Sequence, residues 1–285
     1  KCSPATYGDF IYIIMLARLL NINRNNVNLI IIYGEYRQSW SRLTKKGKKI
    51  FLNDLLKISK YFLNDSIKIQ LITWNQFIKL NEHKKKNILF EKRILNRKRI
   101  YHYIFNFMNY FFYFDKKNFK KILLENKPKN FISVHARYNV KGKFYSSDIS
   151  LERNMAKEDL EKILIKIRKK YRGYKIIVLT DLNGFRYYKS LKRKITNIIF
   201  SKEISKTFLD DAKLLLNSKK YFQYHGGGMG IFATFSNIPY LFCWKSYDFI
   251  NNEFFWIKDK KYASWQNRYQ QTFICRQLKD YLNLI

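Results

Sequence analysis

Residues 131–137 read FISVHAR, a short apolar run that stops at His135 and Arg137. Residues 219–230 read KKYFQYHGGGMG, where a second apolar run ends in a histidine and a cluster of glycines. Both runs have the length and composition of buried strands. Open α/β folds bind nucleotides and phosphates at the edge where the carboxyl ends of their parallel strands meet. We therefore expect the two motifs to share that edge and to serve a phosphorylated ligand.

Strand-like and helix-like segments alternate on either side of these motifs. Residues 48–63 place apolar side chains at helical spacing between two short apolar runs, 28–34 and 67–74. The sequence ENKPKN at 125–130 interrupts the pattern, and a second alternating series follows it. Alternation of this kind is typical of βαβ units. The second series is expected to contain strands at 131–137, 174–180, 196–201, 219–225 and 239–244 and helices at 158–171 and 206–217.

The length of 285 residues allows two domains. We predict an α/β protein with two Rossmann-like domains that face each other across a cleft, each built on a parallel sheet flanked by helices. The first domain is expected at 1–125. The second, which would bind the phosphorylated ligand, is expected at 126–265, and a closing C-terminal helix at 266–285.

The chain is strongly basic. Lys and Arg number 56 against 21 Asp and Glu, a formal net charge of +35. Such a charge is typical of proteins with a polyanionic partner, such as nucleic acid or an anionic membrane. However, the basic residues are spread along the chain, and the abundance of Lys, Asn, Ile, Phe and Tyr is what an AT-rich genome imposes. We prefer compositional drift with a general affinity for anions, and keep a dedicated polyanion surface as the alternative.

The cysteines and the apolar runs bear on the compartment. Cys2, Cys243 and Cys275 are widely separated and odd in number, so we expect neither a metal site nor a disulfide, and a reducing cytoplasm fits. No apolar run reaches the roughly 18 residues that span a bilayer, and the N-terminus lacks the layout of a secretion signal. Residues 84–114, basic and then aromatic, either form a core or hinge element or dock peripherally on an anionic membrane.

Arg137 is the strongest candidate for an anion contact. An arginine at the end of a buried strand is costly unless an anion or a carboxylate partners it. Its planar fork suits the oxygens of a diphosphate, and His135 points to the same face because strand side chains alternate. The alternative is structural, with Arg137 paired to a carboxylate such as Asp181 or Asp148.

The glycine cluster is the second candidate. Successive glycines let the backbone approach a ligand closely, and the following helix presents amides and the positive end of its dipole to an anion. No Gly-Lys-Ser/Thr follows, and the spacing is not that of a dinucleotide fingerprint. The alternative is a tight turn that needs no ligand. The residues concerned are His225, Gly226, Gly227, Gly228, Met229 and Gly230.

Two further polar positions belong to the second domain. Arg153 lies in the polar loop 138–156 and is a candidate for a second phosphate contact, while its neighbour Asn154 is equally a candidate N-cap. Asp181 follows a strand, and either holds a ribose or sugar hydroxyl or orients Arg137.

The first domain offers two candidate general bases. Asp9 opens an apolar helix, where it either caps that helix or, in the cleft arrangement, faces the ligand as a base. Glu35 follows a strand and is the other candidate. The histidines and cysteines provide no spacing typical of a metal site.

At His135-Ala136-Arg137, with the glycine turn downstream, the chain resembles the α1,6-fucosyltransferase and protein O-fucosyltransferase superfamily. More broadly it resembles inverting glycosyltransferases of the GT-B fold. The family carries His-X-Arg-Arg at a strand end, and the resemblance implies that Arg137 binds the donor diphosphate with His135 beside it. Tyr138 stands where the family has its second arginine.

The resemblance covers roughly residues 131–244. Thr180-Asp181-Leu182 resembles the family's "TD" strand end, and His225 to Gly230 occupies the place of its small-residue donor loop. Tyr7-Gly8-Asp9 resembles the Gly-Asp turn that opens many bacterial GT-B enzymes. The second domain would then hold the donor, and the first would be the acceptor side.

The resemblance implies a metal-independent, inverting glycosyltransferase. It would transfer a sugar, with fucose as one candidate, from a nucleotide-diphosphate sugar to a glycan or lipid-linked acceptor. No other cofactor is expected. The alternatives are a nucleic-acid-binding basic protein and a noncatalytic relative that binds nucleotide sugars.

Overall fold

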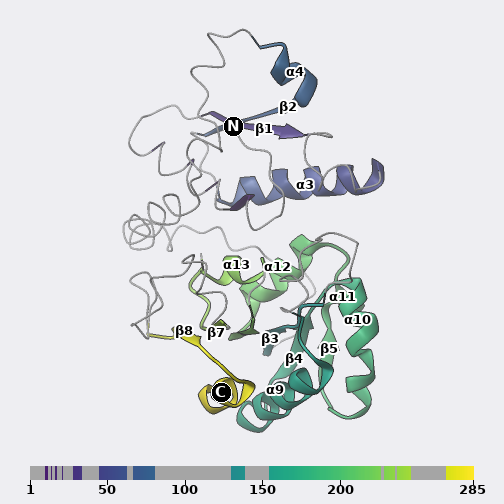
Figure 1. Cartoon of the computed structure of the whole chain (residues 1–285), viewed down its shortest axis with the longest axis vertical. Coiled ribbons are helices and arrows are strands. Elements are labelled where there is room, and N and C mark those ends of the chain that lie inside the picture. The colour runs from purple at the N-terminus through teal and green to yellow at the C-terminus, as the bar shows by residue number, and fades with distance from the viewer. Residues whose placement is uncertain are drawn as a thin grey trace. The chain divides into compact units, whose positions relative to one another are not determined.

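The computed structural model describes residues 10, 11, 14, 17, 21, 28–33, 45–62, 67–80, 130–138, 154–225, 228–234, 236–244 and 268–285. The chain divides into two compact units, Lys1–Lys120 and Lys121–Ile285 (Figure 1). The arrangement in which two domains face each other across a cleft stays a prediction.

The first unit contains a parallel βαβ arrangement. β1 and β2 pair in parallel, with Ile31 opposite Leu71. The helix between them, α3, buries Leu55 and Ile58 completely, as its apolar spacing predicts. The elements are β1 (Asn28–Tyr33), α3 (Lys45–Phe62), β2 (Lys68–Thr73) and α4 (Trp74–Ile78).

The second unit is built on a six-stranded sheet in the order β5-β4-β3-β6-β7-β8. Every neighbouring pair is parallel. The predicted α/β fold, with a parallel sheet flanked by helices, is confirmed. The strands are β3 (Phe131–His135), β4 (Lys175–Leu179), β5 (Ile198–Phe200), β6 (Tyr221–Tyr224), β7 (Tyr240–Trp244) and β8 (Gln270–Ile274). The helices are α9 (Lys157–Lys170), α10 (Leu182–Tyr188), η2 (Lys189–Arg193), α11 (Ser201–Ile204), α12 (Phe208–Asn217), α13 (Gly230–Thr234) and α15 (Leu278–Leu284).

Helices cover both faces of this sheet (Figure 1). On one face, Ile132 and Val134 of β3 join a core cluster with Leu160 of α9 and Tyr281 of α15. On the other face, Gln223 of β6 lies against Gly230 of α13. Both faces are therefore buried, as the continuous apolar strands predict.

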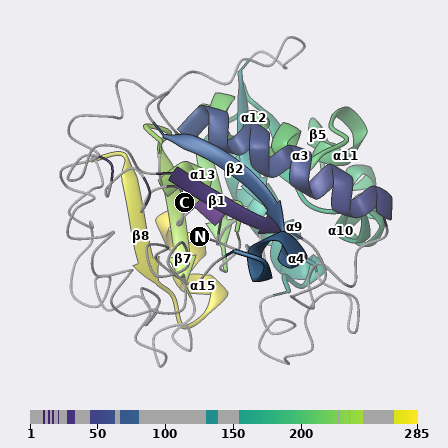
Figure 2. The same ribbon diagram turned by 90° about the horizontal axis from the view of Figure 1, so that it is seen from above.

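The C-terminal segment differs from the prediction of one closing helix over 266–285. Gln270–Ile274 forms β8, which lies beside β7 (Figure 2), and only Leu278–Leu284 is helical. The Gln270 side-chain amide donates to the carbonyls of Ser236 (2.7 Å) and Ile238 (3.0 Å). The helical expectation was wrong because β7 has backbone groups along its outer edge that a further strand satisfies.

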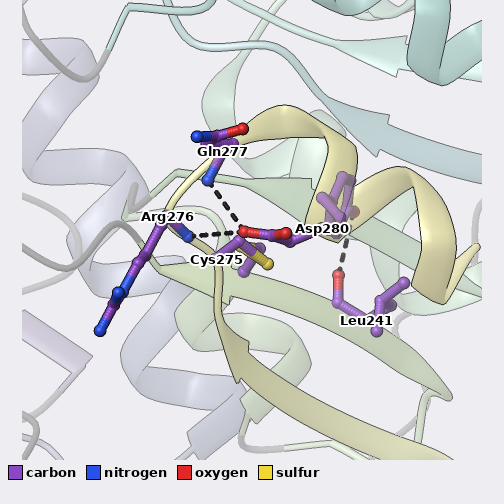
Figure 3. The surroundings of a disulfide bond; sticks show 7 residues. Leu241, Cys275, Arg276, Gln277 and Asp280 are labelled. Carbon is purple, nitrogen blue, oxygen red and sulfur yellow. Dashed lines mark hydrogen bonds between the residues drawn. A yellow bond between two sulfur atoms is a disulfide. The ribbon is translucent and has the colours of Figure 1, made fainter.

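The expectation that the cysteines form no disulfide was also wrong. Cys243 of β7 and Cys275, just after β8, are joined by a disulfide with a Cα–Cα distance of 5.9 Å. Both residues are buried. Around Cys275, the backbone N–H groups of Arg276 and Gln277 donate to the Asp280 carboxylate at 3.1 and 3.0 Å (Figure 3). Parallel pairing of β7 with β8 brings the two cysteines together, and their spacing along the chain carries no sign of it.

No helix within the described ranges is long and apolar enough to cross a bilayer. The segment 84–114, for which a core element or a peripheral membrane contact was expected, lies outside the described residues.

Candidate functional site

The two sequence motifs meet at the centre of the six-stranded sheet. In chain order the strands run 3-2-1-4-5-6 across the sheet, so β3 and β6 are the neighbours at which the direction of winding reverses. Their register pairs Ser133 with Tyr221 and His135 with Gln223. Arg137 and His225 each come two residues after that last pair. Doubly wound folds bind ligands outside the carboxyl ends of the strands at this switch point.

His135 is a neutral imidazole at this edge. Burial, with a smaller contribution from the charge of Arg137, lowers the pKa of His135 to about 3. Although the residue as a whole is half-buried, its Nδ1 is enclosed and has no hydrogen-bond partner within the described part of the chain. Buried polar atoms are rarely left unsatisfied in folded proteins. His135 is therefore available as a hydrogen-bonding group for a ligand or an ordered water.

The backbone around Arg137 is firmly held. The Ala136 N–H donates to the Leu179 carbonyl of β4 (3.0 Å), and the Met155 N–H donates to the Arg137 carbonyl (3.1 Å). The Tyr188 hydroxyl lies 3.1 Å from the same carbonyl oxygen. The chain thus leaves the sheet at residue 137 and returns beside it at residue 155.

Asp181 caps a helix. Its Oδ1 accepts a hydrogen bond from the Gly184 N–H at 2.6 Å, at the start of α10. Partial burial raises the pKa of the Asp181 carboxyl, while the N–H groups of Gly184 and Asn183 and the charges of Lys202 and Arg137 act in the opposite direction. The hydrogen bond from Gly184 makes Asp181 the N-cap of α10. The two roles expected of Asp181, holding a ribose or sugar hydroxyl and orienting Arg137, stay predictions.

The described part of the glycine turn is mainly packed. His225 is buried in the left-handed region at φ 72°, and its N–H donates to the Cys243 carbonyl at 3.1 Å. Met229 is also buried. A Cβ on Gly230 would lie 2.5 Å from the Oε1 of Gln223, a buried side chain whose oxygen accepts a hydrogen bond from the Tyr221 hydroxyl, so this glycine lets α13 pack closely on β6. Among the described residues of the turn, Gly228 is exposed and can offer its amide to a ligand.

The helix after the turn is short. α13 has 5 residues, so its dipole is weak, and individual amides rather than the helix dipole are what the turn can offer an anion.

Several candidate residues lie outside the described part of the chain. These are Asp9, Glu35, Arg153, Gly226 and Gly227, and their roles stay predictions. Asn154 is described, but the N-cap of α9 is Ala156, so the capping role expected of Asn154 was wrong.

Tyr138 occupies the position of the resembling family's second arginine. Its ring stacks on Tyr187 of α10 with centroids 4.3 Å apart, and it packs against the core cluster beneath α9 and α10. The side chain of Tyr138 is thus engaged in aromatic packing with α10.

Two groups of residues were missed at the sequence level. Tyr188 is fully buried and bonds to the strand end, yet it looks like one more aromatic core residue. Lys202, partly buried, and Asp211, buried, form an ion pair with Nζ and Oδ2 2.6 Å apart, close to the carboxyl end of β5. The signal for this pair is a lysine two residues after the end of a strand. Its carboxylate partner is recognisable only in three dimensions.

Among the described residues, no group of three or more His, Cys, Asp or Glu side chains could hold a metal ion.

Comparison with known proteins gives a distant structural likeness. No family model and no curated protein matches the chain. Among solved structures, it is similar to a glycosyl transferase family 9 protein from Veillonella parvula, with 10% identity and a TM-score of 0.34 over 97% of this chain and 70% of that chain. This likeness assigns neither a substrate nor a site residue to the chain.

Proposed function

We propose that the protein is a glycosyltransferase that binds a nucleotide-diphosphate sugar at the β3–β6 edge of its second unit. The observation that carries the proposal is the switch point itself. The two motifs, far apart in sequence, end on adjacent parallel strands in the register His135 opposite Gln223. Crevices at such a point are the usual nucleotide sites of doubly wound folds.

The composition of the edge favours a nucleotide sugar over a dinucleotide cofactor. Dinucleotide-binding folds carry their glycine fingerprint directly after the first strand of the sheet. Here the first strand is β3, and the connection after it holds Gly142 alone, whereas the glycine cluster follows the fourth strand, β6. The strand end that would carry the fingerprint carries His135 and Arg137 instead, as in the glycosyltransferase superfamily that the sequence resembles.

The proposed chemistry is a single displacement. The acceptor oxygen attacks the anomeric carbon of the sugar, the bond from that carbon to the diphosphate oxygen breaks, and the acceptor proton passes to a base. Arg137 would neutralise the charge that develops on the leaving diphosphate, assisted by amides of the glycine turn. The candidate bases stay Asp9 and Glu35. We further propose that the transfer inverts the anomeric carbon, that fucose is one candidate for the sugar, and that the acceptor is a glycan or a lipid-linked molecule.

A binding experiment tests the first step. The full chain is titrated with GDP, UDP and CDP in phosphate-free buffer, and the melting temperature and heat of binding are recorded. A ligand at 100 times its Kd stabilises the folded state by about 2.7 kcal/mol. Arg137→Ala removes a charged hydrogen-bonding group worth about 1.5–3 kcal/mol, so we expect roughly 10- to 100-fold weaker binding.

The matched control is Arg168→Ala. Arg168 is also partly buried and donates to a backbone carbonyl, that of Tyr174 (2.9 Å), but it lies at the far end of α9. Its replacement should leave nucleotide affinity unchanged. If no nucleoside diphosphate shifts the wild type, or if Arg137→Ala binds as tightly as Arg168→Ala, the proposal is wrong.

The net charge of +35 favours a second candidate, a protein that binds nucleic acid. Single-stranded RNA serves as a further ligand in the same titration. Affinity for RNA that falls steeply with salt and is indifferent to Arg137→Ala, without any response to nucleoside diphosphates, would favour this candidate.

A further inference from the structure

The backbone carbonyl of Arg137 is the meeting point of three elements. The Met155 N–H donates to it at 3.1 Å, and the Tyr188 hydroxyl lies 3.1 Å from it. The same hydroxyl lies 2.6 Å from the Met155 carbonyl oxygen. Tyr188, at the end of α10, therefore joins the end of β3 to the residues that lead into α9.

The hydroxyl of Tyr188 is a permanent donor. The side chain is fully buried, and this burial, with lesser contributions from Tyr187, Tyr138 and nearby carboxylates, raises the pKa of Tyr188 far above its ordinary value. Its ring is held at both sides, with centroids 4.9 Å from Tyr187 and 6.0 Å from Tyr138. The hydroxyl therefore keeps its proton at neutral pH, and its neighbours restrict the rotation of the ring.

The position of this donor matters because Arg137 has left the sheet. β3 ends at His135, so the ladder hydrogen bonds that orient the strand stop before Arg137. The bonds to the Arg137 carbonyl hold the peptide that follows this residue. The Met155 N–H supplies one of these bonds, and the single Tyr188 hydroxyl proton is shared between the Arg137 carbonyl at 3.1 Å and the nearer Met155 carbonyl at 2.6 Å. Tyr188 therefore also holds Met155, which donates to Arg137.

We propose that Tyr188 is a positioning residue for Arg137. Its hydroxyl fixes the peptide from which the guanidinium extends, and so sets where that charge stands at the switch point. The role of Arg137 in nucleoside diphosphate binding rests on the proposed function. The hydrogen-bonding role of Tyr188 is independent of it.

The test uses two matched tyrosines. Tyr188→Phe removes one oxygen and keeps the ring. Tyr281→Phe makes the same change at a second fully buried tyrosine, whose hydroxyl donates to the Leu241 carbonyl at 3.3 Å. Misplacing a binding group by about 1 Å can cost up to 100-fold in rate. We expect roughly tenfold weaker nucleoside diphosphate binding for Tyr188→Phe and no change for Tyr281→Phe.

A double-mutant cycle separates positioning from general loosening. If Tyr188 acts through Arg137, then Tyr188→Phe costs affinity in the wild type but adds nothing in the Arg137→Ala background. Equal losses in both backgrounds, or wild-type affinity in Tyr188→Phe, would overturn the proposal.

Amide hydrogen exchange provides a measurement that needs no ligand. The Met155 N–H should exchange at least several-fold faster in Tyr188→Phe than in Tyr281→Phe, because its acceptor is no longer held. If the wild type binds no nucleoside diphosphate, the proposed function fails. The hydrogen-exchange rates of Met155 in the two variants then test the hydrogen-bonding role of Tyr188 by themselves. Unchanged exchange at Met155 would then refute the positioning role.

Discussion

Breaking the Cys243–Cys275 disulfide should lower the free energy of unfolding of the second unit. The size of the loss depends on the number of residues between the two cysteines. The bond joins residues 32 apart. In the chain-entropy description, closing a loop of that length removes about 12 cal/mol/K from the unfolded chain, or about 3.7 kcal/mol at 25 °C. For a unit the size of Lys121–Ile285, each kcal/mol corresponds to about 2–4 °C. Reduction should therefore lower the melting temperature by roughly 7–15 °C.

The assay compares three proteins under matched conditions. Wild type is unfolded thermally and in urea with and without dithiothreitol, and alkylation followed by mass spectrometry reports which thiols are free. Cys275→Ser should behave like the reduced wild type and should no longer respond to reductant. Cys2→Ser, the control, should respond as the wild type does.

Two results would refute this reasoning. The first is free thiols at both Cys243 and Cys275 in protein prepared without reductant. The second is a bonded pair whose reduction leaves the urea midpoint unchanged.

Two further predictions concern the candidate site, at His135 of β3 and at Gly230 of α13. The pKa of His135 is lowered to about 3 in the folded state, so below pH 6.5 the imidazole binds a proton in the unfolded chain but not in the folded chain. The free energy of unfolding should therefore fall by up to about 1.4 kcal/mol per pH unit between pH 6.5 and 3. Above pH 6.5 the imidazole is neutral in both states and makes no contribution. Urea unfolding at pH 7.5 and 5 measures this, and His135→Gln should remove that part of the slope; an identical slope in the variant would contradict it. Gly230→Ala places a Cβ 2.5 Å from the Gln223 Oε1 and should cost about 1–3 kcal/mol. At Gly173 nothing lies within 4 Å of such a Cβ, so Gly173→Ala should be tolerated, and equal urea midpoints for the two variants would show that the contact at Gly230 is unimportant.

The strand that ends in Arg137 could be predicted because its information is local. An apolar run that stops at polar residues marks both a buried strand and its carboxyl end. The same applies to α3, whose apolar spacing specifies the buried Leu55 and Ile58. Where a segment lacked such a pattern, as at 266–285, the prediction of one long helix failed.

The errors share one physical cause. β8 is a strand because β7 offers an edge with backbone groups to satisfy, and that edge comes from a distant part of the chain. Cys243 and Cys275 meet for the same reason, since parallel pairing of β7 and β8 aligns the ends that carry them. Tyr188 was indistinguishable from an ordinary core aromatic because its acceptor, the Arg137 carbonyl, is 51 residues away.

Local pattern alone specified the polar strand ends, the α/β alternation and the candidate residues at His135 and Arg137, because each depends on neighbours along the chain. Only the tertiary structure determined that β3 and β6 are adjacent, which groups hold Arg137 in place, and that Met229 and Gly230 serve packing. These features depend on long-range pairing and on burial, which arise when distant segments come together and which no short stretch of residues encodes.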